Sequence, residues 1–191
     1  MTTAQLLGYP LLVISVLELF LGFLLLRTNP RNSPVNKATA ACALAAALWS
    51  MSSGLMYITF HAGHAYIFFA RMSWIGWFTV PTALQTVMFF KSEQSRRARV
   101  TGWVLYPFWA AVLGLCLFTD LVVTPGFVPV PYQNSPGPLE MPFRAIGSIM
   151  AFWLIAEIIL LRRQLIGYRR SQVGYYLSGT IFFTLGGAII G

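Results

Sequence analysis

Three ionisable side chains, Glu18, Arg71 and Glu157, interrupt long apolar stretches of this sequence. If those stretches cross a membrane, each charge costs about 2.5–3.5 kcal/mol on insertion scales, so it turns toward other protein groups, a ligand or the headgroups. These positions are therefore where the sequence suggests chemistry or polar contacts between helices.

Arg71 opens the most distinctive motif, in which Trp74 and Trp77 follow at intervals of three residues. That spacing places the three side chains on one slowly rotating face of a helix. The functional interpretation is a ligand cavity, with Arg71 as the counter-charge for an anion that enters from outside. The structural alternative is that Arg71 reaches the headgroups or pairs with Asp120 or Glu140, while the tryptophans pack the bundle.

The two carboxylates differ in depth. Glu18 lies past the middle of its apolar run, so we expect it to face the bundle interior as a polar core contact, with a role in proton transfer as the alternative. Glu157 is five residues from Arg162. It is expected to be solvated or paired with an arginine.

His61 and His64 form a His-x-x-His pair in a short uncharged turn. Histidines at this spacing can ligate a metal or a pigment, but no cysteine or carboxylate lies close in sequence to complete a site. The pair therefore indicates an interfacial turn, and no cofactor is predicted. Cys42 and Cys116 lie inside apolar runs, as is typical of small buried side chains.

The composition identifies the class of protein. Of the 191 residues, 57% are apolar and 9% are charged, whereas about a quarter of the residues of a soluble domain are charged. This excludes an ordinary soluble enzyme and predicts an all-α, polytopic transmembrane helix bundle that forms a single domain over residues 1–191. Six spans are expected, over residues 6–26, 38–59, 67–90, 100–118, 143–161 and 173–191.

The basic residues predict the orientation of the bundle. Eleven of the 13 Lys and Arg follow the first, third and fifth spans, and the other two are Arg71 and Arg144. The positive-inside rule then places those three loops in the cytoplasm and the N-terminus outside. The net charge of +8 is explained by topology, and no nucleic-acid partner is expected.

Two of the spans carry local features that affect packing. Pro81 removes a helix hydrogen bond and is expected to kink the third span. Small residues recur every fourth position along the second span and predict close helix contact in the bundle, with homodimerisation as the alternative. They are Cys42, Ala46, Ser50 and Gly54.

The segment between the fourth and fifth spans, residues 119–142, contains six prolines, five of them at positions 125–138. Proline lacks a donor and fixes its dihedral, so regular helix is disfavoured there. Because part of the segment is apolar, we expect it to fold over the outer mouth of the bundle as a lid or a docking surface.

Three stretches together resemble a known family. The first is Arg27-Thr-Asn-Pro-Arg-Asn-Ser-Pro-Val-Asn-Lys37. The second is Phe69-Ala-Arg-Met-Ser-Trp-Ile-Gly76 with Val80-Pro81. The third runs from Gly137-Pro-Leu139 through Leu161-Arg-Arg163 and Arg169-Arg-Ser-Gln172 to Gly186-Gly187. They are similar to the seven-helix membrane region at the N-terminus of bacterial sensor histidine kinases and related signalling proteins.

The resemblance implies a receptor module of the bacterial inner membrane, with no catalytic residue in the membrane region. In the family a seventh helix leads to cytoplasmic signalling domains, whereas this sequence ends with the sixth predicted span. The expected partners are the lipid bilayer, a small-molecule ligand from the outer side, and other membrane subunits or a second copy. The alternative function is an accessory or scaffolding subunit of a larger membrane complex.

The predicted topology can be tested by labelling. Single cysteines placed at Asn32, Ser95 and Gly167 should react only from the cytoplasmic side, because each lies in a basic loop. Labelling of any of the three by an impermeant reagent added outside intact cells would contradict the orientation.

Overall fold

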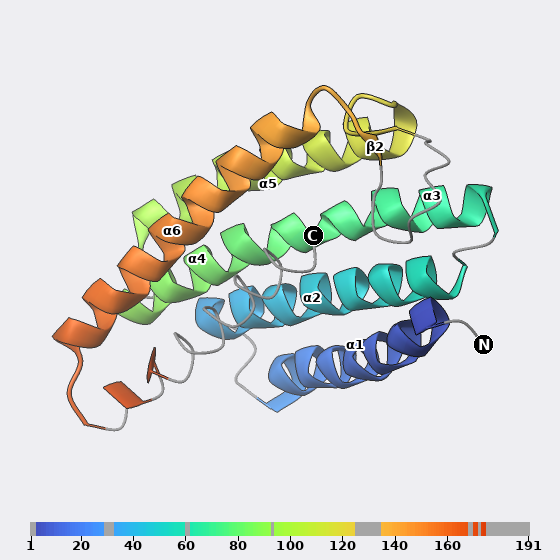
Figure 1. Cartoon of the computed structure of the whole chain (residues 1–191). Helices are drawn as coiled ribbons and strands as arrows, with labels where there is room; N and C mark the ends of the chain where they lie inside the picture. Colours follow the sequence, from blue (N-terminus) through green and yellow to red (C-terminus); the bar gives the residue numbers. More distant parts are fainter. Residues whose placement is uncertain are drawn as a thin grey trace.

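A computed structural model describes residues 3–28, 33–59, 62–92, 94–124, 135–167, 170–171 and 173–174. The chain folds as a bundle of helices with one short hairpin (Figure 1). The helices are α1 (Thr3–Thr28), α2 (Pro34–Ile58), α3 (His64–Met72), the 3₁₀ helix η1 (Ser73–Phe78), α4 (Thr79–Lys91), α5 (Arg96–Phe118) and α6 (Glu140–Gln164). The strands are β1 (Val123–Thr124) and β2 (Ser135–Pro136).

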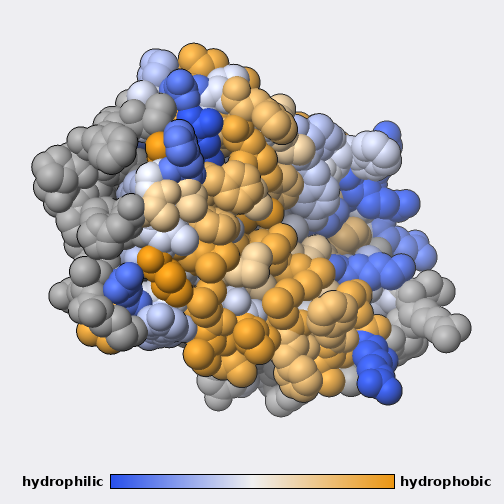
Figure 2. Space-filling model, turned by 90° about the vertical axis from the view of Figure 1, so that its right-hand side faces the viewer, coloured by the Kyte–Doolittle hydropathy of each residue, from blue (hydrophilic) through white to orange (hydrophobic). Residues whose placement is uncertain are grey.

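Four of the helices are long and apolar enough to cross a membrane: Gln5–Arg27 within α1, α2, α5 and α6. Figure 2 shows the matching surface, a hydrophobic area across the middle of one face with hydrophilic residues toward its margins. The mostly helical architecture, with helices apolar enough to span a membrane, is thus as predicted. Except for positions 173 and 174, the predicted sixth span lies outside the described residues.

The spanning helices begin earlier than the apolar runs suggested, because their first turns carry polar or helix-starting residues. Pro34 occupies the first turn of α2, where its missing N–H has no helical partner to lose. The Ser95 side chain accepts a hydrogen bond from the Ala98 N–H and caps α5. Glu140 lies in the first turn of α6, where a carboxylate complements the helix dipole.

The third predicted span, 67–90, is not a single helix. It consists of α3, η1 and α4 in direct succession, with the 3₁₀ segment immediately before the turn that contains Pro81. Proline cannot donate to the carbonyl four residues earlier, and its ring crowds that carbonyl, which disfavours regular α-helix at this point. The distortion near Pro81 is thus a 3₁₀ segment that ends at Phe78, and the predicted kink itself stays a prediction.

Threonine hydroxyls make additional hydrogen bonds around this break. The Thr79 hydroxyl donates to the Gly76 carbonyl at 2.6 Å, and the Thr82 hydroxyl donates to the Phe78 carbonyl at 2.8 Å. In lipid an unpaired backbone group costs several kcal/mol, so such side-chain donors make a broken helix tolerable.

Helix α4 lies at the centre of the bundle, with α2 on one side and α5 and α6 on the other, while α1 packs on α2 (Figure 1). Ten of its 13 residues are buried. A helix that is apolar and buried nearly all round is a core helix. In this bundle α4 therefore holds its neighbours together.

The described basic residues gather at one end of the bundle. This basic end is where α1, α4 and α6 finish and α2 and α5 begin (Figure 1). Its cationic residues are Arg27, Lys37, Lys91, Arg96, Arg97, Arg99, Arg162, Arg163 and Arg170. The opposite, hairpin end carries Arg71 and Arg144. Most of the described basic residues thus lie at one end of the bundle, as the sequence predicted.

The small residues of α2 mediate contacts within the chain. A Cβ at Gly54 would lie 2.9 Å from the Gly8 carbonyl oxygen of α1, so only glycine allows this approach. On another side of α2, the Cys42 thiol lies 3.6 Å from the Thr79 carbonyl oxygen of α4. The ridge therefore packs against two helices of the same chain, as the bundle-packing interpretation expected.

Replacing Gly54 by alanine should separate α1 from α2. Because the clash is with backbone, we expect a loss of about 1–3 kcal/mol of unfolding free energy and a lower midpoint of thermal unfolding in detergent. Gly114→Ala is the matched control, since a Cβ there meets nothing within 4 Å. Equal midpoints for the two variants would contradict the close α1–α2 contact.

Candidate functional site

Arg71, in the last turn of α3, ties three elements together at the hairpin end. Its guanidinium donates to the Leu117 carbonyl of α5 at 3.3 Å and to the Val123 carbonyl of β1 at 3.2 Å. It also forms an ion pair with Asp120. The side chain of Arg71 is 15% exposed and that of Asp120 is 63% exposed. The structure therefore confirms the structural alternative in which Arg71 pairs with Asp120.

The hairpin places backbone over this end of the bundle. Val123 pairs with Pro136 in an antiparallel register, and the Gly137 N–H donates to the Val122 carbonyl at 2.9 Å. Val122 and Val123 are buried against the bundle. The two ends of the proline-rich segment thus pack on the bundle, whereas its centre, 125–134, lies outside the described residues. The apolar part that was expected to fold over the outer mouth belongs to this centre, so that expectation stays a prediction.

Trp74 and Trp77 pack between helices. Trp77 stacks on Trp109 of α5 with ring centroids 5.6 Å apart and planes 6° from parallel. Trp74 is 7% exposed, and its ring lies 6.3 Å from that of Trp77. Trp74 is therefore buried and Trp77 half-buried, and both rings contact other helices of the bundle.

Glycines of the neighbouring helices make room for this aromatic group. A Cβ at Gly147 of α6 would lie 2.1 Å from the Trp77 ring. On the other side of η1, a Cβ at Gly76 would lie 2.6 Å from the Trp49 ring of α2. The 3₁₀ segment therefore packs against α2, α5 and α6.

A second charged pair borders Trp74. The Arg144 side chain donates to Glu140 at 2.8 Å, one turn earlier on α6. The guanidinium carbon of Arg144 lies 5.9 Å from the centre of the Trp74 ring, within the range of a cation–π contact. We call these residues the outer cluster, after the side on which the positive-inside rule predicts the hairpin end: Arg71, Trp74, Trp77, Trp109, Asp120, Glu140 and Arg144.

The outer cluster contains buried polar atoms that have no hydrogen-bond partner in the described part of the chain. They are Arg71 Nε, Trp109 Nε1 and Glu140 Oε2. Buried polar groups nearly always bond to protein, ordered water or a ligand. With two donors and one acceptor, the cluster suits water or a small polar molecule.

Glu18 is a polar core contact, as predicted. Its carboxylate accepts a hydrogen bond from the Ser50 hydroxyl of α2 at 2.8 Å. Ser50 is buried. The contact fixes α1 against α2, and a role in proton transfer stays a prediction.

Glu157 pairs with an arginine as expected, although not with Arg162. Its carboxylate accepts hydrogen bonds from Arg97 of α5 at 2.7 Å and from the Trp153 indole at 3.1 Å. Nearness in sequence suggested Arg162, but the fold brings the start of α5 beside the end of α6. Arg97 also lies 5.7 Å from the Trp153 ring centre.

The histidine pair is only partly described. His64 begins α3 and is exposed, while His61 lies outside the described residues. Among the described residues no group of three metal-ligating side chains comes together.

The sequence interpretation missed Trp109 and Arg144 as members of the outer cluster. Trp109 is one of several aromatic residues in α5, and Arg144 was counted only as a basic residue at the outer end. Their roles depend on how α5 and α6 are rotated toward η1, which no local motif encodes.

No protein-family model, curated protein or solved structure matches this chain. Function must therefore be argued from the site itself. The outer cluster combines two ion pairs, stacked indoles and unpartnered buried polar atoms. Such a set offers charge, aromatic surface and hydrogen bonds, which suits recognition of a polar molecule.

Alanine at Gly147 tests the packing of the aromatic group. The new methyl must displace the Trp77 ring from Trp109, so the near-ultraviolet circular dichroism of the tryptophans should weaken. We also expect a loss of about 1–3 kcal/mol of unfolding free energy. Gly114→Ala should leave the spectrum unchanged, and an unchanged spectrum for Gly147→Ala would contradict the stack.

Proposed function

We propose that this chain is an integral membrane sensory module in which the outer cluster receives a signal. The observation that carries the proposal is the position of the break in the third span. Arg71, Trp74 and Trp77 lie on α3 and η1, and η1 continues directly into α4, the central helix that ends at Lys91. A change at the outer cluster would thus act on the helix that reaches the basic end.

The proposed orientation has the hairpin end and the N-terminus outside, in a bacterial inner membrane. It is supported by the gathering of the described cations at the opposite end, since cytoplasmic loops carry an excess of Lys and Arg. In this orientation the Asp120 side chain, 63% exposed, is accessible from outside.

The 3₁₀ segment provides a physical means of transmission. A 3₁₀ helix rises about 2.0 Å per residue and an α-helix about 1.5 Å, so conversion of the six residues of η1 would shorten the span by about 3 Å. A ligand changes such a balance only if it binds one form better than the other. An anionic molecule that competes with Asp120 for Arg71 would meet this condition, because the pair links α3 to the hairpin.

The alternative function, an accessory subunit, is favoured by a different observation. Helix α1 leaves a wide apolar face exposed, including Val13, Leu17 and Phe20 at 61–66%. This face suits acyl chains, and it equally suits the helix of a neighbouring subunit. As an accessory subunit, the chain would need no coupling between the two ends of the bundle.

A distance measurement separates the two functions. Spin labels at Gln94 and Gln164, both exposed at the basic end, report the separation of α4–α5 from α6. In a sensory module, Asp120→Asn should shift this distance by about 2 Å or populate a second distance, because helix movements in switching proteins have this size.

The matched control is Thr124→Ala, which removes a hydroxyl contact to the Asp120 backbone but leaves the Asp120 carboxylate in place. It should leave the distance distribution unchanged. If Asp120→Asn also leaves it unchanged while the protein stays folded, the sensory proposal is wrong and the accessory role is favoured.

A further inference from the structure

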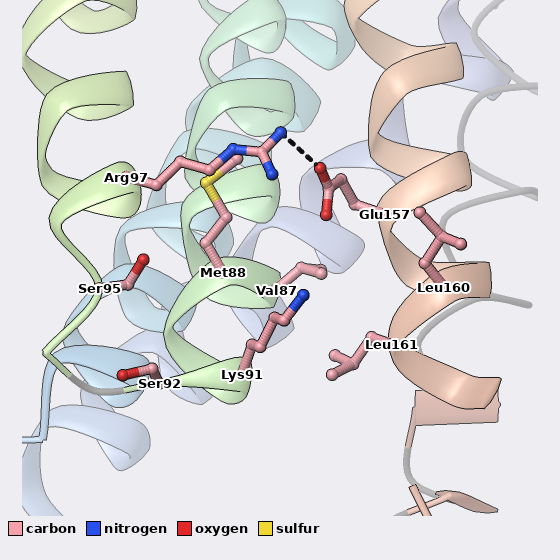
Figure 3. Close-up of a pocket in the computed structure, with 9 residues that line it drawn as sticks. All are labelled: Val87, Met88, Lys91, Ser92, Ser95, Arg97, Glu157, Leu160 and Leu161. Atoms are coloured by element: carbon pink, nitrogen blue, oxygen red, sulfur yellow. Dashed lines mark hydrogen bonds and ion pairs between the residues drawn. The ribbon is translucent and has the colours of Figure 1, made fainter. Parts of the chain in front are cut away.

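A second site lies at the basic end, remote from the outer cluster. Helices α4, α5 and α6 line a partly open cavity of about 230 Å³ there (Figure 3). One wall is apolar, formed by Val87 and Met88 of α4 and by Leu160 and Leu161 of α6. The polar rim includes Lys91 and Arg97.

The two cationic side chains of the rim, Lys91 and Arg97, stay exposed to solvent. Glu157, the carboxylate in the cavity wall, is already bonded to Arg97 and to the Trp153 indole. The Arg97 side chain nevertheless stays 61% exposed. Lys91 is exposed, forms no ion pair with any described residue, and extends toward the space between α4 and α6 (Figure 3).

The surroundings strengthen the positive potential at this level. Arg96 and Arg99 follow in the first turn of α5, and Arg162 and Arg163 end α6. The positive dipole end of α5, capped by Ser95, is offset by the negative ends of α4 and α6, so the positive potential comes from the side chains. Glu157 neutralises one of the rim cations, and the neighbouring arginines leave an excess of positive charge that attracts an anion.

The apolar wall gives the site a second property. Leu161 is buried, whereas Leu160 is 51% exposed, so the wall continues from the cavity onto the outer surface of α6. That surface belongs to a helix apolar enough to span the membrane. An occupant can therefore place a charged group at the rim and hydrocarbon along α6.

We propose that this cavity binds the headgroup of an anionic phospholipid. The phosphate oxygens accept hydrogen bonds from the Lys91 ammonium and from the exposed side of the Arg97 guanidinium, and an acyl chain follows Leu160. Basic pockets between helices at the cytoplasmic side suit such headgroups. Free phosphate offers the same oxyanion without the hydrocarbon, so it would use the rim but not the wall. The proposal does not depend on the sensory function.

The test is lipid binding to the purified full chain, measured by native mass spectrometry in detergent. Phosphatidylglycerol and phosphatidylcholine with identical acyl chains are titrated separately, with and without excess inorganic phosphate. Phosphatidylglycerol should bind more tightly, and Lys91→Gln should weaken it about fivefold, the effect of about one lysine near an anionic headgroup.

The matched control is Lys37→Gln, which removes the other lysine at the basic end, outside the cavity. It should change the affinity less than twofold. Leu160→Trp, which fills the apolar wall without changing charge, should also weaken phosphatidylglycerol binding.

Three results would overturn the proposal. Equal losses for the two lysine variants would mean diffuse surface charge, and equal affinity for the two lipids would mean no headgroup recognition. Complete displacement by inorganic phosphate, with no effect of Leu160→Trp, would mean a site for a free anion.

Discussion

The missing hydrogen bond at Pro81 is the constraint on which the rest of this structure depends. In hydrocarbon every backbone polar group must be paired within the protein, so a broken helix has to be enclosed by other elements. The break lies in η1 and the start of α4, and every residue from Thr79 to Leu84 is buried. The broken stretch is thus enclosed by the other helices, whereas Pro10 of α1 and Pro107 of α5 lie inside unbroken helices and are exposed.

The enclosure of η1 also explains the composition of its neighbours. Trp49 and Trp109 approach from α2 and α5, and Gly147 of α6 leaves space for Trp77. Large rings fill the irregular volume beside a 3₁₀ segment, and glycines allow the close approach. Because these contacts come from three helices, a change in η1 cannot stay local, which is what the proposed sensory role requires.

Much of the fold could be predicted from the sequence, because apolar length and the positions of basic residues are direct consequences of the bilayer. The partners across helices could not be predicted in the same way. In a soluble helix, apolar periodicity shows which face is buried, but in lipid the buried face and the exposed face are both apolar. The sequence therefore indicated that Glu157 would be solvated or paired with an arginine, and only the rotation of α5 determines that its partner is Arg97.

The same argument explains why polar contacts fix the register of this bundle. Apolar helices in lipid can slide or rotate past one another at little cost, whereas a paired charge has one partner at one height. Glu18 with Ser50 fixes α1 on α2, and Arg97 with Glu157 fixes α5 on α6 at the basic end. Arg71 with Asp120 fixes α3 on the hairpin at the other end. At the hairpin end, the pair of Arg71 and Asp120 combines a nearly buried cation with a largely exposed carboxylate, so a molecule can reach this carboxylate without unpacking a helix.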